Sequence, residues 1–260
     1  MKNKSMICVA PNGAYRKKND HPALPMTAKE LAIEAKKCLA AGADMMHVHV
    51  RSSDGEHSLD SKIYSEALAE IKTAIGDKML LQITTESGRK YHYREQFKCV
   101  YDLTPAAFSV ALREALPEAE AKPIFVDLLK FAQKNNVLPQ YILYAPQELA
   151  ILRQLIDEKI ITEERPHVLY VIGKKFAASN EAFLFTDFLS AYSRYFITNE
   201  LRFMTCGFGA DEHNLSLASL AAGGDVRLGF ENNLFLPDGT TAEDNAALIR
   251  ALFNNLRDRK

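Results

Sequence analysis

Short apolar segments alternate with longer, more polar segments along most of this chain. The apolar segments are rich in β-branched and aromatic residues and have the length of buried strands. They cover residues 7–10, 45–50, 79–84, 106–110, 141–144, 168–172, 202–206 and 226–230. Strands that are apolar on both faces must be covered on both faces, so this pattern favours a parallel sheet packed against helices.

Several intervening segments carry apolar residues at the spacing of one helix face. Two such stripes consist of Leu31, Ala35, Cys38 and Leu39, and of Leu248, Ile249, Leu252, Phe253 and Leu256. Helix starts are indicated by a capping box from Thr27 to Glu30, and by Asp60 and Thr241 at N-cap positions. We therefore predict helices between the strands.

Eight strands that alternate with helices over 260 residues indicate the α/β class. The expected architecture is a single-domain (β/α)8 TIM barrel that spans residues 1–260. A doubly wound open sheet is the alternative. It is disfavoured because such sheets usually place a glycine-rich phosphate loop after the first strand, where this chain has Pro11-Asn12-Gly13-Ala14.

Composition and net charge argue against nucleic acid and membranes as partners of this chain. The chain is 47% hydrophobic and 25% charged, and its formal net charge of −1 provides no field to attract nucleic acid or an anionic membrane. The longest apolar runs fall well short of about 18 residues, so we expect neither a signal peptide nor a membrane span. Four widely separated cysteines predict free thiols in a reducing compartment, the cytoplasm.

The candidate chemistry begins at His47-Val-His49-Val-Arg51, at the end of the second apolar segment. Alternate side chains of a strand share a face, so both imidazoles and the guanidinium are expected to point the same way. Two such imidazoles can hold a divalent ion, and Arg51 adds positive charge for an anionic substrate. The alternative is a pair of hydrogen-bonded core histidines, but burying three such groups requires partners that a metal and an anion would supply.

Active sites of these barrels lie at the carboxyl ends of the strands, where Glu231 follows the last apolar segment. Two histidines and one glutamate form a ligand set of catalytic zinc, with positions left open for substrate. Arg227 in the same segment favours an anionic substrate that carries a carbonyl group. The alternative for Glu231 is an exposed loop acid.

Further candidates for substrate binding are polar residues after the first and third strands: Asn12, Thr84, Thr85 and Ser87. The three hydroxyl groups could equally cap their own loop. The remaining histidines without ligand spacing are predicted to be surface or structural residues: His57, His92, His167 and His213. The pair Lys174-Lys175 could be solvated or could meet a phosphate.

The two motifs His47-x-His49-x-Arg51 and Arg227-x-Gly-x-Glu231-x-Asn233, in this order, resemble the β-keto acid cleavage enzymes. Shorter matches occur at Asn12-Gly13-Ala14, His21-Pro-Ala-Leu-Pro25 and Ala41-Gly42-Ala43. The type member of this family is 3-keto-5-aminohexanoate cleavage enzyme. The segment between residues 124 and 198 resembles the family only loosely.

This resemblance implies an acyltransferase that combines a β-keto acid with acetyl-CoA to give acetoacetate and a new acyl-CoA. It implies Zn²⁺ bound by His47, His49 and Glu231, and by analogy a homo-oligomer, a tetramer. Arg227 would be a catalytic electrostatic residue, and Thr84 or Thr85 would hold the substrate carboxylate. We hypothesise a Claisen condensation followed by retro-Claisen cleavage, with zinc as Lewis acid.

The chain departs from the family after its glutamate ligand. Many members carry an aspartate there that is thought to act as the base, whereas this chain has Asn232, which cannot accept a proton at neutral pH. Either proton transfer beside Asn232 runs through water, or another residue is the base. Glu86 is our candidate, because a carboxylate near zinc and two arginines should stay ionised. The alternative is a salt bridge of Glu86 with Arg89 or Arg51.

Three other functions share parts of this pattern. A metal-dependent hydrolase needs further histidines after later strands, where this chain has Tyr144 and Ile172. The other metal-dependent alternative for a small carboxylate substrate is a lyase of the kind that acts on a hydroxy-acyl-CoA. Its His-x-His comes late in the chain, whereas here the motif comes early. A barrel that only binds its ligand, with structural histidines, would contain no stoichiometric metal.

Overall fold

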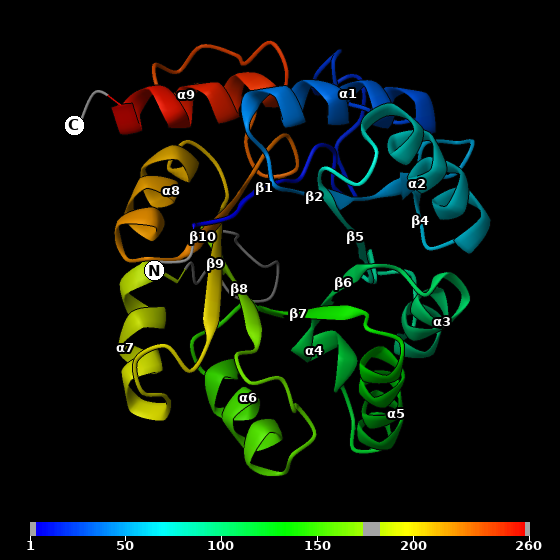
Figure 1. Cartoon of the computed structure of the whole chain (residues 1–260), viewed down its shortest axis with the longest axis vertical. Helices are drawn as coiled ribbons and strands as arrows, with labels where there is room; N and C mark the ends of the chain where they lie inside the picture. Colours follow the sequence, from blue (N-terminus) through cyan, green and yellow to red (C-terminus); the bar gives the residue numbers. More distant parts are fainter. Residues whose placement is uncertain (1–3, 174–182, 258–260) are drawn as a thin grey trace.

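The computed structural model describes residues 4–173 and 183–257, and within these ranges eight parallel strands close into a barrel (Figure 1). The strands pair around the barrel in the order β1-β10-β9-β8-β7-β6-β5-β2, so the first strand also pairs with the last. Their bounds are β1 Ile7–Val9, β2 Met45–Val48, β5 Leu80–Thr84, β6 Ala107–Ala111, β7 Leu138–Leu143, β8 His167–Ile172, β9 Arg202–Gly207 and β10 Asp225–Leu228. The predicted (β/α)8 TIM barrel is therefore confirmed.

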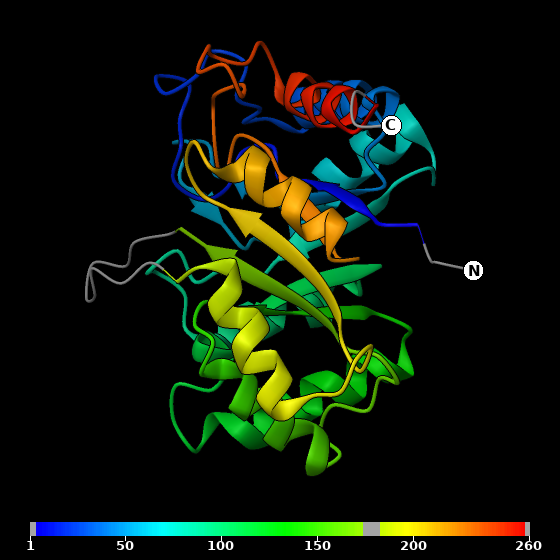
Figure 2. The same ribbon diagram turned by 90° about the vertical axis from the view of Figure 1, so that its left-hand side faces the viewer.

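The helices lie outside the strands and surround the barrel (Figures 1 and 2). They are α1 Ala28–Ala41, α2 Ser61–Ile75, α3 Tyr93–Leu103, α4 Leu112–Ala115, α5 Ala121–Lys134, α6 Glu148–Asp157, α7 Phe185–Tyr195, α8 Glu212–Ala221 and α9 Asn245–Arg257. Their order in the chain follows the predicted alternation with the barrel strands. Within the described ranges, every helix is too short or too polar to cross a bilayer.

One predicted strand is divided in two. The segment 45–50 supplies β2 to the barrel and then leaves it, and Val50–Arg51 forms β3, which pairs antiparallel with β4, His57–Ser58. The turn between them closes through a hydrogen bond from Gly55 N to Ser52 O of 2.8 Å. Gly55 has a φ of +81°, a conformation that glycine adopts without steric cost. The hairpin was not predicted, because a two-residue strand leaves too little pattern.

Two apolar layers hold the barrel together, because successive residues of each strand face opposite sides. The larger layer lies between strands and helices and includes fully buried Tyr64, Phe97, Phe108 and Phe125. The smaller layer fills the barrel interior with Cys8, Met45, Ile142, Leu169, Val171, Met204 and Cys206. Buried polar side chains share this interior, among them Gln82, Gln140 and Arg227.

Two of the three predicted N-caps are confirmed. Thr27 forms the full capping box with Glu30, and the Asp60 carboxylate accepts a hydrogen bond from Lys62 N at the start of α2. Thr241 is wrong as a cap, because α9 begins only at Asn245. Asp244 takes this role instead, since its Oδ1 accepts a hydrogen bond from Ala247 N at 2.8 Å.

The first and last helices close the ring of helices, and α1 and α9 lie side by side in Figure 1. Asn245 at the start of α9 donates from both its backbone N and its Nδ2 to Glu34 Oε1 of α1, each at 2.9 Å. Its Oδ1 accepts a hydrogen bond from Phe230 N at 2.7 Å. This contact fixes the start of the loop that follows β10.

Candidate metal centre

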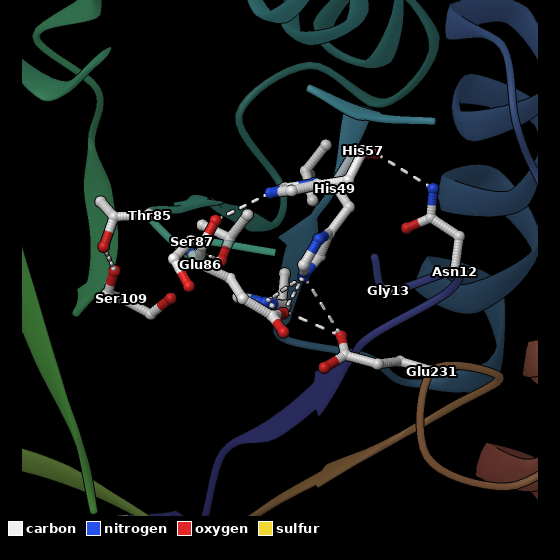
Figure 3. A network of polar contacts seen from close by, with 12 residues as sticks. Asn12, Gly13, His49, His57, Thr85, Glu86, Ser87, Ser109 and Glu231 are labelled. Carbon is white, nitrogen blue, oxygen red and sulfur yellow. Dashed lines mark hydrogen bonds and ion pairs between the residues drawn. The ribbon is translucent and has the colours of Figure 1, made fainter. Parts of the chain in front are cut away.

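The imidazoles of His47 and His49 and the carboxylate of Glu231 converge at the carboxyl ends of the strands. Figure 3 labels two of these residues, His49 and Glu231. The Nε2 atoms of His47 and His49 are 3.0 Å apart. Glu231 Oε2 lies 3.5 Å from His49 Nε2 and 3.8 Å from His47 Nε2. The histidines come from the end of β2 and the glutamate from the loop after β10, and β1 lies between these two strands. Closure of the barrel thus joins residues that are far apart in the sequence.

Burial keeps both histidines neutral. Burial, followed by the charge of Arg227, lowers the pKa of His47 to about 4, and burial lowers the pKa of His49 well below its usual value. His47 Nδ1 lies 2.7 Å from Gln82 Oε1, an oxygen that can only accept a hydrogen bond. His47 therefore carries its hydrogen on Nδ1, and its Nε2 lone pair faces His49 and Glu231.

The loop after β10 positions Glu231. The Glu231 backbone N donates to Ala10 O at 3.0 Å, and Arg227 Nη2 donates to Glu231 Oε1 at 2.9 Å, so that Oε2 faces the histidines. Gly13 makes this approach possible, because a Cβ there would lie 2.4 Å from Glu231 Cγ. Burial by itself would lower the pKa of the Arg227 guanidinium. Its electrostatic interactions with Cys206 and Glu231 are stronger than this effect, so the pKa is raised.

The three side chains fit a divalent metal ion. Ligand atoms about 2.0–2.1 Å from a tetrahedral zinc lie about 3.3 Å from one another, and the observed separations of 3.0, 3.5 and 3.8 Å bracket that value. Among the described residues, His49 Nδ1 has no hydrogen-bond partner, so the ring can carry its hydrogen there and present Nε2. Gln82 and Arg227 orient the ligands as partners of metal-binding residues do.

Glu86 lies beside these three residues. Its Oε2 is 3.9 Å from His49 Nε2, and its side chain is 13% exposed. Glu86 N donates to Thr84 Oγ1 at 3.0 Å, and its carbonyl O accepts a hydrogen bond from His57 Nε2 at 2.8 Å. The Tyr15 hydroxyl is also hydrogen-bonded to the Glu86 side chain. Hydrogen bonds to both the backbone and the side chain of Glu86 therefore hold its carboxylate close to the three metal-binding candidates.

A small cavity, with about 10 Å³ of space for the centre of a water molecule, opens next to the three metal-binding candidates. On the β10–β2–β5 side it is lined by the polar residues His47, Thr84, Glu86, Arg227 and Glu231. On the β7–β8–β9 side it is lined by Ile142, Tyr144, Val171 and Phe208. A ligand in this cavity would thus meet one polar and one apolar wall.

The predicted hydroxyl groups take different directions. Thr84 lines the cavity, and although its Oγ1 accepts a hydrogen bond from Glu86 N, its own hydrogen can still be donated. Thr85 instead donates to Ser109 O at 2.8 Å, away from His49 in Figure 3. Ser87 donates to Glu114 Oε1 at 2.8 Å. The geometry therefore favours Thr84 over Thr85 and Ser87 as a substrate-binding residue.

Asn12 and Arg51 support the site through backbone carbonyls. Asn12 Nδ2 donates to His49 O at 3.0 Å (Figure 3) and also to Pro25 O at 3.0 Å. Arg51 is buried, and its guanidinium donates to the carbonyl oxygens of Gly55, Gly13 and Arg16. These bonds hold the first loop against the hairpin. The geometry favours this supporting role for Arg51 over contact with an anionic substrate.

Asn232 lies directly behind Glu231 and is buried. Its Nδ2 donates to Arg227 O at 3.2 Å, and its Oδ1 accepts hydrogen bonds from Arg227 Nη2 at 3.4 Å and from Cys206 Sγ at 3.3 Å. Burial raises the pKa of the Cys206 thiol to about 11, so it remains protonated and can donate. In this structure the Asn232 amide orients Arg227.

Besides Gln82 and Tyr15, the sequence missed three residues near the site. His57, predicted as surface or structural, is buried on β4 with its ring centroid 5.3 Å from that of His49. Ser109 is in register with Thr84 on the adjacent strand, and no described residue bonds its hydroxyl. Glu212 of α8 accepts hydrogen bonds from Gly229 N and Asn233 Nδ2. A sequence signal existed only for His57, as the partner of Arg51 in a hairpin around Ser52-Ser53-Asp54-Gly55.

The other histidines have structural contacts, as predicted. His92 caps α3, His167 pairs with Asp225, and His213 contacts Asn255. Lys174 and Lys175 lie outside the described residues.

The chain is similar in sequence to enzymes of known activity. It is 27% identical over 248 residues to the 3-oxoadipate:acetyl-CoA acetyltransferase of Cupriavidus necator, covering 94% of this chain and 85% of that enzyme. It is 24% identical over 252 residues to the 3-keto-5-aminohexanoate cleavage enzyme of Acetoanaerobium sticklandii, covering 95% of this chain and 89% of that enzyme.

A solved structure shares the fold. The ternary complex of ObcA with a C4-CoA adduct and oxalate superposes with a TM-score of 0.68 at 13% identity, covering 92% of this chain. The chain spans 64% of the length of ObcA, and at this identity the likeness concerns the fold alone.

The model of the β-keto acid cleavage enzyme family matches residues 4–259, nearly the whole chain. The barrel, with its two histidines and late glutamate at the carboxyl ends of the strands, therefore belongs to an enzyme of the β-keto acid cleavage enzyme family.

Proposed function

We propose that this enzyme transfers the carboxymethyl part of a β-keto acid to the acetyl group of acetyl-CoA. A β-keto acid R–CO–CH2–COO⁻ and acetyl-CoA then give acetoacetate and R–CO–CoA, so that all atoms are conserved. The single observation that carries the proposal is the convergence of His47, His49 and Glu231 beside a cavity lined by Thr84 and Glu86. Membership of the family and the names of both relatives support it.

We propose Zn²⁺ as the ion that His47, His49 and Glu231 hold, because neutral imidazoles and one carboxylate are typical of catalytic zinc. When bound, zinc would supply Lewis-acid polarisation of the substrate carbonyl. Glu231 is kept in place for this ligation by Arg227, and His47 by Gln82.

The protein residues would bind the substrate carboxylate, remove a proton and stabilise the negative charge that develops. The Thr84 hydroxyl donates to the substrate carboxylate, and Glu86 removes a proton from the carbon between the two carbonyl groups. The resulting carbanion attacks the thioester carbonyl and releases coenzyme A thiolate. The thiolate then attacks the original ketone, and the carbon–carbon bond breaks to give R–CO–CoA and the acetoacetate carbanion. Protonated Glu86 returns its proton to that carbon, and acetoacetate leaves. Arg227 offsets negative charge that develops in these steps.

The apolar wall of the cavity suggests the chemical class of the substrate. Ile142, Val171 and Phe208 offer no charge to pair with a charged tail. Arg113 stacks 4.6 Å above the Tyr144 ring, but it is already paired with Glu148 at 2.9 Å. Because an unpaired charge is costly to bury, we propose that R is an uncharged, apolar chain.

One incubation tests both points. Acetyl-CoA labelled in its acetyl carbons is mixed with zinc-loaded enzyme and either 3-oxohexanoate or 3-oxoadipate, which differ only by a terminal methyl or carboxylate. We expect label in acetoacetate, and faster turnover of 3-oxohexanoate. Unlabelled acetoacetate would refute the condensation, whereas faster turnover of 3-oxoadipate would refute only the apolar tail.

His47→Ala provides the matching variant. Loss of a ligand should reduce turnover by about a thousand-fold, equivalent to about 4 kcal/mol of transition-state stabilisation. His92→Ala, which removes an exposed histidine that caps α3 and lies outside the ligand set, should retain both zinc and activity. Equal zinc content in wild type and His47→Ala would place the metal elsewhere.

We further propose a cytoplasmic homotetramer. The four cysteines are buried free thiols, which suits a reducing compartment. Large apolar side chains are exposed on and after α7, including Leu189, Tyr195 and Ile197, and such side chains favour burial against another subunit. Light scattering of the purified protein at monomer mass would refute the oligomer.

A further inference from the structure

A continuous line of hydrogen bonds crosses the barrel interior from His47 to Asp225. His47 Nδ1 lies 2.7 Å from Gln82 Oε1, and Gln82 Nε2 donates to Gln140 Oε1 at 3.2 Å. Gln140 Nε2 lies 3.4 Å from His167 Nδ1, and His167 Nε2 lies 3.2 Å from Asp225 Oδ2. These residues come from β2, β5, β7, β8 and β10, five of the strands around the barrel in Figure 1.

The line is anchored at the amino ends of the strands. Asp225 is the first residue of β10, and its carboxylate also accepts hydrogen bonds from Arg202 Nε at 2.6 Å and from Met6 N at 2.7 Å. It thus faces donors on three sides and remains an acceptor. His167 is the first residue of β8, and burial lowers its pKa, so the ring is neutral.

The donor and the acceptor of each hydrogen bond in the line are determined by the preceding bond, starting from Asp225. Because Asp225 accepts, His167 must carry its single hydrogen on Nε2, which leaves a lone pair on Nδ1. Gln140 therefore turns its Nε2 toward His167, where Met204 Sδ at 3.5 Å is a further acceptor. Although Gln140 Nε2 is also 3.3 Å from His167 Nε2, that nitrogen already donates to Asp225.

The same reasoning reaches the metal centre. With Nε2 of Gln140 turned to His167, its Oε1 faces Gln82 and accepts from Gln82 Nε2. The Oε1 of Gln82 then faces His47 and can only accept, so His47 carries its hydrogen on Nδ1. If the Gln82 amide turned over, its NH2 would face Nδ1, and the hydrogen would move to Nε2. A protonated Nε2 cannot bind a metal.

We propose that Gln82 and Gln140 are positioning residues that set the tautomer of His47, so that its Nε2 lone pair is ready to bind the metal. The proposal deepens the proposed function, since it concerns the same metal centre. His47 is fixed through side chains on four other strands, and the direction of every bond follows from the Asp225 carboxylate. Removing a partner of a metal-binding histidine typically weakens metal affinity by about 10–100-fold.

The tautomer of His47 is measured directly in metal-free protein with ¹⁵N-labelled histidine by NMR, and the His47→Asn variant assigns its signals. In wild type we expect the Nδ1–H form. In Gln82→Met, which removes both acceptor and donor, we expect a mixture or the Nε2–H form, and zinc affinity in chelator competition about 10–100-fold weaker. Gln140→Met should give a smaller change in the same direction.

Gln82→Glu separates positioning from packing. Its carboxylate still accepts from His47 Nδ1, so the tautomer and zinc affinity should stay near wild type, although a buried charge lowers thermal stability. If Gln82 had only a structural role, Gln82→Met would keep more zinc affinity than Gln82→Glu, because a buried apolar side chain is tolerated better than a buried charge. Thr205→Val, a buried polar residue of the barrel wall outside the line, should leave both readouts unchanged.

The outcomes separate this proposal from the proposed function. The Nε2–H form in metal-free wild type, or an unchanged tautomer in Gln82→Met, would overturn the positioning role even if zinc and activity are present. Wild type in the Nδ1–H form with no measurable zinc binding would support the hydrogen-bonded line and refute the metal centre.

Discussion

Glu86 and Glu231 both approach His49, with Oε2 atoms 3.9 and 3.5 Å from His49 Nε2, but their neighbours differ. Arg227 binds Glu231 Oε1, which stabilises the charged carboxylate as a ligand requires. Glu86 is joined instead to the Tyr15 phenol, whose pKa rises to about 12 through burial and then the charge of Glu86. A neutral phenol holds a carboxylate in place without neutralising it. The neighbours therefore suit Glu231 to ligation and Glu86 to accepting a proton.

Glu86→Gln should reduce turnover by about 10²–10⁴-fold, because an amide cannot take the proton that the condensation removes. Zinc affinity should stay unchanged, since Glu86 lies outside the ligand set. Steady-state kinetics and chelator titration measure the two quantities. Glu66→Gln, an exposed glutamate on α2, is the matched control. Near-normal turnover of Glu86→Gln would remove this residue from the mechanism.

At the scale of elements, the loop after β10 determines whether the ligand set is complete. Gly229 has a φ of +137°, and a Cβ there would lie 2.4 Å from Ala10 O. The same Ala10 oxygen accepts from Glu231 N, and Glu212 holds Gly229 N from α8. The loop is therefore pressed between β1 and α8, and its close backbone contact places Glu231 over β2.

Gly229→Ala should push this loop away from β1 and lower zinc affinity by at least about tenfold, together with the melting temperature. Gly239→Ala is the matched control. Gly239 also has a positive φ, of +85°, but a Cβ there has no atom within 4 Å, so only backbone strain of about 1 kcal/mol is added. Calorimetry and chelator competition compare them. Equal zinc affinity in the two variants would contradict this role of the loop.

At the scale of the whole molecule, Asp225 connects the last three strands of the barrel with the start of the first strand. Its carboxylate joins β10 to β8 through His167, to β9 through Arg202, and to the residue before β1 through Met6 N. Burial opposes its charge, but the hydrogen bonds from His167 and Arg202 outweigh burial and leave the pKa of Asp225 below its ordinary value. A lowered carboxylate pKa stabilises the fold above about pH 4, and this stability is lost as the pH falls through the folded-state pKa.

Asp225→Asn should therefore cost roughly 2 kcal/mol at pH 7, a decrease of about 5 °C in melting temperature, because Arg202 loses its charged partner. The difference from wild type should narrow as the pH falls from 5 to 3, because the unfolded wild-type chain then binds a proton at this carboxylate, whereas the folded protein, with its lower pKa, stays charged to a lower pH. Thermal melts over this range measure it, with exposed Asp127→Asn as control. A difference that stays constant down to pH 3 would show that the charge of Asp225 is not the cause.

The order of strands and helices could be predicted because it depends on local pattern. Buried strands such as β1 and β8 are apolar over nearly their whole length, and helix starts at Thr27 and Asp60 follow from contacts within one turn. The candidate ligands could also be named, since His47 and His49 share a strand end, and Glu231 follows the last strand.

What the sequence by itself determined is thus the set of elements and the chemical types at their ends. Only the tertiary structure decided which atoms meet, because closure of the barrel brings β2 and β10 to either side of β1. It turned Thr85, Ser87 and Arg51 toward supporting contacts, and it brought Gln82 against His47. These contacts join residues on different strands, and a one-dimensional pattern carries no information about the rotation of a side chain around its own bonds.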